Sequence, residues 1–497
     1  MNSKVKINRL NTGVSGLDEL LGGGLPEFSF NLIAGPPGSG KTTLAHQIMF
    51  SLANPDRRAV FFTVLGEPAL KMLRYQQQFS FFDISKINHS IRFVNLASDL
   101  FDGEFEKVLS RIAGEVRDFT PSLVFVDSFR SVVQSARGAT AENFGLQQFV
   151  QQLAMQMTSW QATTFLIGEY LMPEAESSPV FTVADGILWM AQHLHRDAMV
   201  RKLQVVKMRG QAQRPGQHTF RITDDGVEIF PRILKPAVVG DLGIVGDQRM
   251  STGVPELDNM LGGGLPIGYS LLSVGPSGSG KTVLATEFLA EGARRGETGV
   301  IAAFEKGPNQ LLSRRLDELV KDGKVGVIDT RSLDLSIDET LHDMIVMIKR
   351  MNARRVVIDS LSGFELALAP VFREDFRETL YRMVATLTGM GVTVWMTAEL
   401  EDRYTDLRFS SHGSAFLGDA IIMQRYVEIA GQMKRVLSVV KVRGSDHSKD
   451  LRFFDIGKDE IVIGKRLVNY QGILSGFPVQ LSDEEIRKSD LDGDAQP

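Results

Sequence analysis

One glycine-rich octapeptide occurs twice in this sequence, at positions 35–42 and 275–282. The copies read Gly-Pro-Pro-Gly-Ser-Gly-Lys-Thr and Gly-Pro-Ser-Gly-Ser-Gly-Lys-Thr, and both fit the pattern G-x-x-x-x-G-K-[ST]. In this pattern the glycines let backbone N–H groups surround anionic phosphate oxygens. The sequence therefore predicts two binding sites for a nucleoside triphosphate.

Each residue of the loop has an expected role. Lys41 and Lys281 would reach the terminal phosphates, and the hydroxyl groups of Thr42 and Thr282 would ligate Mg²⁺. The predicted nucleotide-contacting residues of the two loops are Gly38, Ser39, Gly40, Lys41, Thr42, Thr43, Gly278, Ser279, Gly280, Lys281, Thr282 and Val283.

The sequence around the loops repeats as well. Residues 11–48 and 251–288 align without a gap, and 21 of the 38 aligned positions are identical. Duplication of a whole domain is the simplest explanation, and a chain of 497 residues can hold two domains of this size. We expect a first domain at 1–233, a linker at 234–250, a second domain at 251–481 and an acidic, disordered tail at 482–497.

Short apolar runs alternate with helical patterns in both copies. The expected strands are 30–33, 59–65 and 122–127, then 271–274, 300–304 and 355–359, and the expected helices are 43–52, 105–116 and 341–350. Almost continuously apolar strands that alternate with helices predict an α/β fold, in which helices cover both faces of a mainly parallel sheet.

Composition excludes several classes of protein. The net charge of −5 gives no basic surplus for nucleic acid, so nucleic acid is not expected as a partner. No apolar run is long enough to span a bilayer, so no membrane association is expected. The sequence contains no cysteine and shows no apolar secretory segment near its start, which favours a cytoplasmic protein.

An aspartate ends the third expected strand of each copy. Asp127 and Asp359 could hold the Mg²⁺ shell from a strand beside the loop, as the Walker-B aspartate does in this class of nucleotide site. The alternative is a solvated strand end, and the loop in the same repeat favours the metal role.

Hydrolysis needs a carboxylate that orients or deprotonates the attacking water. Glu305 directly follows the strand 300–304 and is the catalytic candidate of the second copy. The first copy has Leu65 and Gly66 at that place, with Glu67 one position later. A shift of one residue turns an extended side chain to the opposite face, so Glu67 is not expected to replace Glu305. A surface glutamate is the alternative for both.

A Lys-x-Arg-Gly sequence closes each copy. Lys207 and Arg209, like Lys441 and Arg443, would lie on one face of a strand, two cations side by side. A solvated edge strand is the alternative. Their repetition favours a phosphate contact, reaching a neighbouring subunit as an arginine finger does. We assign Lys207 and Arg209 to nucleotide binding, and Lys441 and Arg443 to catalysis.

The order of these motifs resembles the KaiC family of double-domain RecA-like ATPases. Thr-Gly-Val-x-x-Leu-Asp, Gly-Gly-Leu-Pro, the loop and Lys-x-Arg-Gly all occur twice, and 424–444 and 473–478 extend the resemblance. It implies two tandem RecA-like domains in a homo-hexameric ring of two tiers. ATP and Mg²⁺ would lie at subunit boundaries in both tiers. The resemblance also implies Ser/Thr autokinase activity and a KaiB-like or other signalling protein as partner.

Three features depart from the family pattern. Family members usually carry a Glu-Glu pair after the second strand of each domain, where this chain has Leu65-Gly66 and Glu305-Lys306, so hydrolysis is expected mainly in the second domain. The phosphate-accepting Ser-Thr pair falls on Ala415 and Phe416, which cannot accept phosphate, and the clock cycle is therefore not transferred. Glu27-Phe28 replaces Ile267-Gly268, which predicts an altered turn. The serines nearest the lost acceptor pair are Ser410, Ser411 and Ser414.

Two other functions fit the same residues. A signalling scaffold that ATP switches, with little catalysis, is favoured by Leu65 and Gly66 and opposed by Glu305. A RecA-like DNA-handling ATPase shares the expected fold, but the sequence lacks the basic surplus that such proteins usually show.

Overall fold

In the described residues, each half of the chain is built on a nine-stranded sheet. The structure is a computed structural model, and its chain divides into two units, Met1–Arg232 and Ile233–Pro497. The described residues are 7–63, 69–100, 105–129, 143–171, 178–195, 198–233, 248–304, 314–328, 336–368, 370–373, 376–400, 417–457, 461–468, 470–473 and 479–480.

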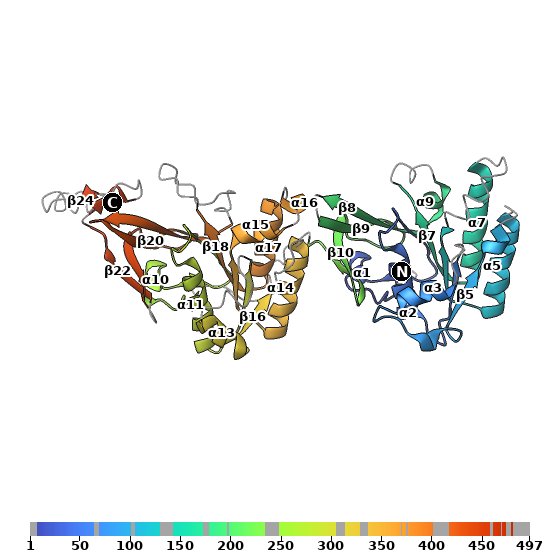
Figure 1. Ribbon diagram of the computed structural model, residues 1–497, viewed down its shortest axis with the longest axis horizontal. Coiled ribbons are helices and arrows are strands. Elements are labelled where there is room, and N and C mark those ends of the chain that lie inside the picture. Colours follow the sequence, from blue (N-terminus) through green and yellow to red (C-terminus); the bar gives the residue numbers. More distant parts are fainter. Residues whose placement is uncertain are drawn as a thin grey trace, which may run out of the picture. The chain divides into compact units, whose positions relative to one another are not determined.

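The first unit alternates strands and helices up to β8 and ends in antiparallel strands (Figure 1). Its elements are β1 Arg9–Leu10, α1 Leu17–Leu20, β2 Leu25–Pro26, β3 Phe30–Gly35, α2 Lys41–Leu52, β4 Ala59–Thr63, α3 Ala69–Gln76, η1 Ile84–Lys86, β5 Ile91–Asn95, α4 Ala97–Leu100, α5 Phe105–Phe119, β6 Leu123–Asp127, α7 Asn143–Ser159, β7 Thr163–Glu169, α9 Pro179–Val183, β8 Gly186–His195, β9 Ala198–Met208, β10 Gln217–Thr223 and β11 Gly226–Phe230.

The second unit repeats this order. Its elements are β12 Arg249–Met250, α10 Pro255–Met260, β13 Leu265–Pro266, β14 Ser270–Gly275, α11 Lys281–Arg294, β15 Gly299–Ala303, α13 Arg314–Lys321, β16 Val325–Ile328, α14 Ile337–Met351, β17 Arg355–Asp359, α15 Leu361–Ala367, α16 Pro370–Arg373, α17 Phe376–Gly389, β18 Thr393–Glu399, β19 Ala420–Ile429, β20 Gln432–Val442, β21 Arg452–Ile456, β22 Ile461–Arg466, β23 Tyr470–Gln471 and β24 Val479–Gln480.

The two sheets have the same strand order. The first runs β5-β4-β6-β7-β3-β8-β9-β10-β11, and the second runs β16-β15-β17-β18-β14-β19-β20-β21-β22. The first six strands of each order are parallel, and the last three are antiparallel to their neighbours. This arrangement confirms the predicted α/β fold with two tandem, mainly parallel domains. β9 and β20 are interior strands, but their pairing with β10 and β21 covers only 202–204 and 435–437, so Lys207 and Lys441 are paired with β8 and β19 alone.

Helices cover both faces of each sheet because the central strands bury side chains on both sides. In the first unit one core cluster contains residues of α5, α7 and α9, and the other contains residues of α1 and α2. In the second unit α14, α15 and α17 contribute to one cluster, and α10, α11 and α13 to the other. Figure 1 shows α5 and α7 side by side on one side of the first sheet. No helix in the described part of the chain meets the length and apolarity needed to span a membrane.

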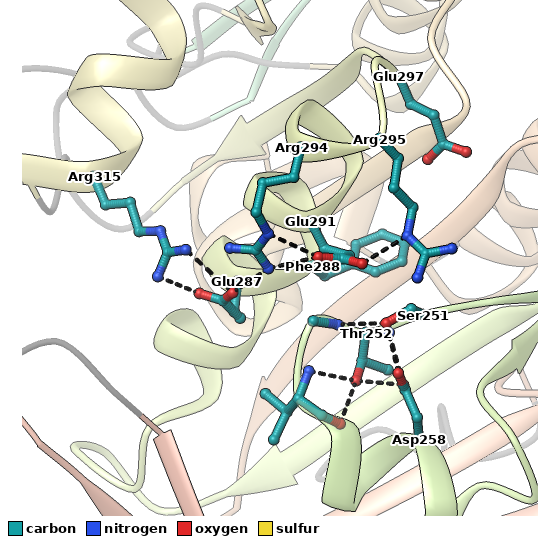
Figure 2. Close-up of polar contacts among 12 residues, drawn as sticks. Ser251, Thr252, Asp258, Glu287, Phe288, Glu291, Arg294, Arg295, Glu297 and Arg315 are labelled. Carbon is teal, nitrogen blue, oxygen red and sulfur yellow. Dashed lines mark hydrogen bonds and ion pairs between the residues drawn. The ribbon is translucent and has the colours of Figure 1, made fainter.

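The repeated Thr-Gly-Val-x-x-Leu-Asp sequence forms a closed turn in both units. The backbone N–H and hydroxyl group of Thr12 donate to Asp18 Oδ1 at 3.0 and 2.8 Å. Thr252 makes the same two bonds to Asp258 Oδ1, both at 2.7 Å, as Figure 2 shows. The Thr and Asp of this sequence are therefore a local structural pair.

The turn before the loop strand is the same in both units, although the residue at its centre differs. Gly268 has φ 79°, and Phe28 adopts the same left-handed region with φ 63°. The N–H of Phe28 donates to Thr163 Oγ1 at 2.9 Å, and that of Gly268 donates to Thr393 Oγ1 at 3.0 Å. The altered turn predicted from Glu27-Phe28 is therefore wrong, because the threonine acceptor holds the backbone in both copies.

Candidate nucleotide-binding sites

Each glycine-rich loop joins a central strand to the start of a helix. β3 ends at Gly35 and α2 begins at Lys41, and β14 ends at Gly275 and α11 begins at Lys281. The residue before each helix is a glycine, Gly40 or Gly280, with φ 95° or 103°, a conformation that other residues rarely adopt. The first N–H groups of a helix have no partner within it and carry partial positive charge. Both loops therefore offer a site for an anion.

The loop lysines lie inside the loops rather than in solvent. Lys41 is 6% exposed and its Nζ donates to Pro36 O at 2.7 Å. Lys281 is 7% exposed and its Nζ donates to Gly275 O and Pro276 O, both at 2.8 Å. Burial lowers the pKa of Lys41, while the charges of Glu169 and Asp127 raise it. A largely buried ammonium group gains from a second anion, which the terminal phosphates of a nucleotide would supply.

In both units the loop threonine bonds to the strand-end aspartate. Thr42 Oγ1 donates to Asp127 Oδ2 at 2.7 Å, and Thr282 Oγ1 donates to Asp359 Oδ2 at 2.8 Å. A hydroxyl group that donates its hydrogen keeps lone pairs for a cation. Mg²⁺ prefers such oxygen ligands and takes further ones from phosphate. The residues present therefore fit Mg²⁺ bound together with a nucleotide.

The two aspartates lie in different surroundings. Burial raises the pKa of Asp127 to about 6, although the hydroxyl group of Thr42 and the charge of Lys41 oppose this change. Asp359 accepts a further hydrogen bond, from the hydroxyl group of Thr397, at Oδ1. The corresponding residue of the first unit is Ile167, which lies opposite Asp127 on the neighbouring strand.

The Lys-x-Arg-Gly sequences lie at the opposite end of the sheet from the loops. Lys207 pairs with Ile187 at the start of β8, whose residues in turn pair with the start of β3. The loop follows the other end of β3, at Gly35. Through Ile187, Lys207 is level with Leu32, three residues or about 10 Å of strand before Gly35 and two strands away sideways. Arg209, whose partner Asp185 accepts the N–H of Phe30, is level with Phe30, about 16 Å before Gly35. β20, β19 and β14 repeat this arrangement for Lys441. Neither pair of cations can therefore reach the nucleotide loop of its own unit.

An aspartate that the sequence analysis did not assign holds each of these arginines. Arg209 Nη1 lies 3.1 Å from Asp185 Oδ1, and the other carboxylate oxygen accepts the N–H of Phe30 at 3.0 Å. Arg443 Nη1 lies 3.1 Å from Asp419 Oδ1 in the same way. Because both aspartates occupy equivalent places in the repeat, aligning the two copies beyond the loop would have found them.

Lys207 and Lys441 share an electrostatic environment. Burial lowers the pKa of each lysine, and the neighbouring arginine lowers it further. The Nζ of Lys207 donates to Thr182 O at 3.0 Å. The expected juxtaposition of two cations therefore occurs, at the end of the sheet away from the loop.

Side chains from the strand beside each loop also fix its backbone. Gln192 Nε2 donates to Pro37 O at 2.9 Å, and Tyr426 Oη donates to Gly278 O at 2.6 Å. Ser279 Oγ donates to Gln424 Oε1 at 3.0 Å. These contacts come from β8 and β19, far from the loops in sequence. The motif alone does not reveal them.

A buried arginine joins the far ends of the second loop helix and the aspartate strand. Arg355 begins β17 and is 1% exposed. Its Nε donates to Glu297 Oε2 at 2.7 Å, and its Nη1 donates to the carbonyl groups of Ser251 and Phe288, both at 2.8 Å. The guanidinium carbon lies 4.6 Å from the ring centre of Phe288. Since α11 begins with the loop lysine and β17 ends with Asp359, this contact helps to fix the two halves of the site.

Ion pairs surround the second half of α11, as Figure 2 shows. Glu287 pairs with Arg294 and Arg315, and Glu291 pairs with Arg294 and Arg295. All three arginines are roughly half exposed, whereas both glutamates are largely buried. Arg355, at 1% exposed, is by contrast fully enclosed by the protein.

Several predicted residues lie outside the described residues. They are Leu65, Gly66, Glu67, Glu305, Lys306, Ser410, Ser411, Ser414, Ala415 and Phe416. The structure brings together the loop, the threonine and the aspartate of each unit, and separates them from the Lys-x-Arg-Gly sequence of that unit.

Comparison with known proteins gives a match over most of the chain. A sequence model of the family described as "ATPase: KaiC" matches residues 10–233 and again residues 250–468. The chain is 28% identical to the circadian clock oscillator protein KaiC of Picosynechococcus sp. over 98% of its length and 95% of the relative. It is 27% identical to the circadian clock protein KaiC3 of Synechocystis sp., with 97% of both chains covered.

Proposed function

The chain belongs to the KaiC family of ATPases, and from this we propose an ATP-binding and ATP-hydrolysing ring protein that acts in signalling. Hydrolysis takes place mainly in the second domain, while the first binds ATP chiefly to hold the ring together. The observation that supports this proposal best is the contact of loop threonine and strand-end aspartate beside a buried loop lysine, repeated in both units.

In the second site the chain's own residues bind and orient the reactants. Lys281 holds the terminal phosphates, and Thr282 and Asp359 hold the metal. Mg²⁺ bound with ATP supplies neutralisation of phosphate charge. Glu305 follows β15, the strand beside β17, and orients the attacking water.

A neighbouring subunit completes each site in this proposal. Lys441 and Arg443 lie at the end of the sheet away from their own loop, so they are available to the nucleotide of another copy. In the first tier Lys207 and Arg209 would do the same. Such head-to-tail contacts generate a closed ring where the rotation between copies closes, and a homo-hexamer of two tiers fits the family. A KaiB-like or other signalling protein is the proposed partner of the ring.

Phosphate release measured for wild type, Glu305→Gln and Glu67→Gln tests this division of labour. Loss of a water-orienting carboxylate typically lowers the rate 10²- to 10⁴-fold, so Glu305→Gln should abolish most of the release. The matched control Glu67→Gln should change it by less than about twofold. Equal losses in both variants would contradict a dominant second site. Negligible release by wild type with intact ATP binding would favour the scaffold function instead.

The same reactions, run with labelled ATP, test the autokinase activity. Family membership supports transfer of phosphate to a serine of this chain, with Ser410, Ser411 and Ser414 as candidate acceptors. Label on any of these three residues would support the transfer. Mass spectrometry that finds all three unmodified after ATP turnover would refute it.

A further inference from the structure

The two sites hold their metal-binding aspartate in different ways. In the second site Asp359 Oδ2 accepts the hydroxyl group of Thr282 at 2.8 Å, and Oδ1 accepts that of Thr397. In the first site Asp127 Oδ2 accepts the hydroxyl group of Thr42 at 2.7 Å. Within the described part of the chain, no second side-chain hydroxyl group donates to Asp127.

The strand register explains this difference. β7 and β18 lie between the loop strand and the aspartate strand of their sheets. β7 begins with Thr163 and β18 begins with Thr393, and each threonine accepts the N–H of the equivalent turn residue in its own unit. The fifth residue of β7 therefore corresponds to the fifth residue of β18. That residue is Ile167 in β7 and Thr397 in β18. Ile167 lies opposite Asp127, and its side chain cannot donate a hydrogen bond.

Thr397 is suited to this contact and to little else. It is 0% exposed, so its hydroxyl group has no access to water and gains from an acceptor inside the protein. Two hydroxyl groups on the two oxygens of one carboxylate fix the carboxylate plane. A residue that orients a metal-binding group in this way typically contributes 10- to 100-fold to metal affinity.

We propose that Thr397 is a positioning residue for Mg²⁺ in the second nucleotide site, and that the first site, with Ile167, therefore binds Mg²⁺ with nucleotide more weakly. The inference rests on the proposed binding of Mg²⁺ and ATP at both loops. It makes the two tiers differ in the Mg²⁺ concentration that they need.

Binding of a fluorescent ATP analogue to the full chain, titrated with Mg²⁺, tests the proposal. Lys41→Ala restricts binding to the second site, and Lys281→Ala restricts it to the first. In the Lys41→Ala background, Thr397→Val should raise the half-saturating Mg²⁺ concentration about tenfold or more. Nucleotide affinity in EDTA should stay unchanged, which a merely structural defect would not allow. Thr397→Ser, which keeps the hydroxyl group, should restore the original Mg²⁺ dependence.

The reciprocal variant and a neighbouring threonine provide controls in the first site. In the Lys281→Ala background, Ile167→Thr should lower the half-saturating Mg²⁺ concentration. Thr63 lies opposite Asp127 on β4, and the structure gives its side chain no bond to that carboxylate. Thr63→Val should therefore have no effect, and a large effect would refute the comparison of the two sites.

Other outcomes of the titration separate this inference from the proposed function. If Thr397→Val and Thr397→Ser show the same Mg²⁺ dependence as the unsubstituted background, the positioning role is wrong while nucleotide binding stands. If neither background binds the analogue at any Mg²⁺ concentration, the proposed function fails as well.

Discussion

The contact between Gly292 and Arg355 predicts that Gly292→Ala destabilises the protein when Arg355 is present and stabilises it when Arg355 is replaced. A Cβ atom at Gly292 would lie 2.6 Å from Cδ and 2.7 Å from Nε of Arg355. Arg355 has little room to move, because Glu297 and two backbone carbonyl groups hold its guanidinium group. Gly292→Ala therefore has to displace the arginine or the helix.

The magnitude follows from two opposing terms. Overpacking of a core site typically costs 1–3 kcal/mol, and weakening a hydrogen bond to a charged group adds about 1.5–3 kcal/mol. Replacing a helical glycine by alanine returns up to about 1 kcal/mol. Gly292→Ala should thus destabilise the wild-type second domain by about 1.5–5 kcal/mol. In an Arg355→Ala background neither Cδ nor Nε is present, and the same change should stabilise by up to about 1 kcal/mol.

Urea denaturation of the four proteins in this double-mutant cycle measures the coupling. Trp395 is buried in the second unit, with its ring centre 5.4 Å from that of Phe288. With Trp160 and Trp189 replaced by Phe, fluorescence reports this unit alone. A coupling energy of about 2.5–6 kcal/mol is expected. If Gly292→Ala has the same effect in both backgrounds, within about 0.5 kcal/mol, the buried arginine does not constrain the helix and the reasoning is refuted.

The matched control is a helical glycine with free space around it. Gly114 lies in α5, and a Cβ atom there would meet nothing within 4 Å. Gly114→Ala should therefore stabilise the first unit by about 1 kcal/mol, in line with helix propensity alone.

Two further predictions concern the neighbouring subunit and pH. Lys281→Ala and Arg443→Ala should each abolish hydrolysis in the second domain. Mixing the two proteins should restore part of the phosphate release, since some interfaces then combine an intact loop with an intact arginine. No recovery in mixed oligomers would refute sites shared between subunits. Burial lowers the pKa of His218 to about 4, below its unfolded value of about 6.5, so the unfolded chain takes up the proton first as the pH falls. Between pH 7 and pH 4 the unfolding free energy of the first unit should fall by up to about 3 kcal/mol more in wild type than in the variant His218→Asn. Asparagine keeps an acceptor for the N–H of Arg232. Parallel pH profiles of the two proteins would contradict this assignment.

Much of the fold was predictable because its strands are apolar on both faces. The strand predicted at 355–359 is β17, and the helix predicted from residue 43 begins two residues earlier, at Lys41. The closeness of Thr42 and Asp127 agrees with the prediction that both hold Mg²⁺, since a Walker-B acid lies beside the loop in this class of site. Periodicity and motif chemistry are local signals, and these features depend on little else.

The remaining parts of the site depend on contacts between distant segments. Thr397 stands in the apolar run Thr393–Glu399 and resembles any β-branched core residue until the strand order places it beside Asp359. In the sequence Arg355 resembles a polar strand end. Its side chain occupies the space left by Gly292, which lies 63 positions earlier in the chain. The end of the sheet that carries Lys207 is set by the antiparallel pairing of β8 with β9. No single segment contains this information.

The separate interiors of the two units bear on how the repeats diverge. Each core cluster seen in the described residues draws its buried members from one unit. For example, Leu52 and Leu123 stand in the first copy where the second has Gly292 and Arg355. Such a paired difference has to be compatible only with the packing of its own copy. Substitutions can therefore accumulate in the interior of one domain without requiring changes in the interior of the other.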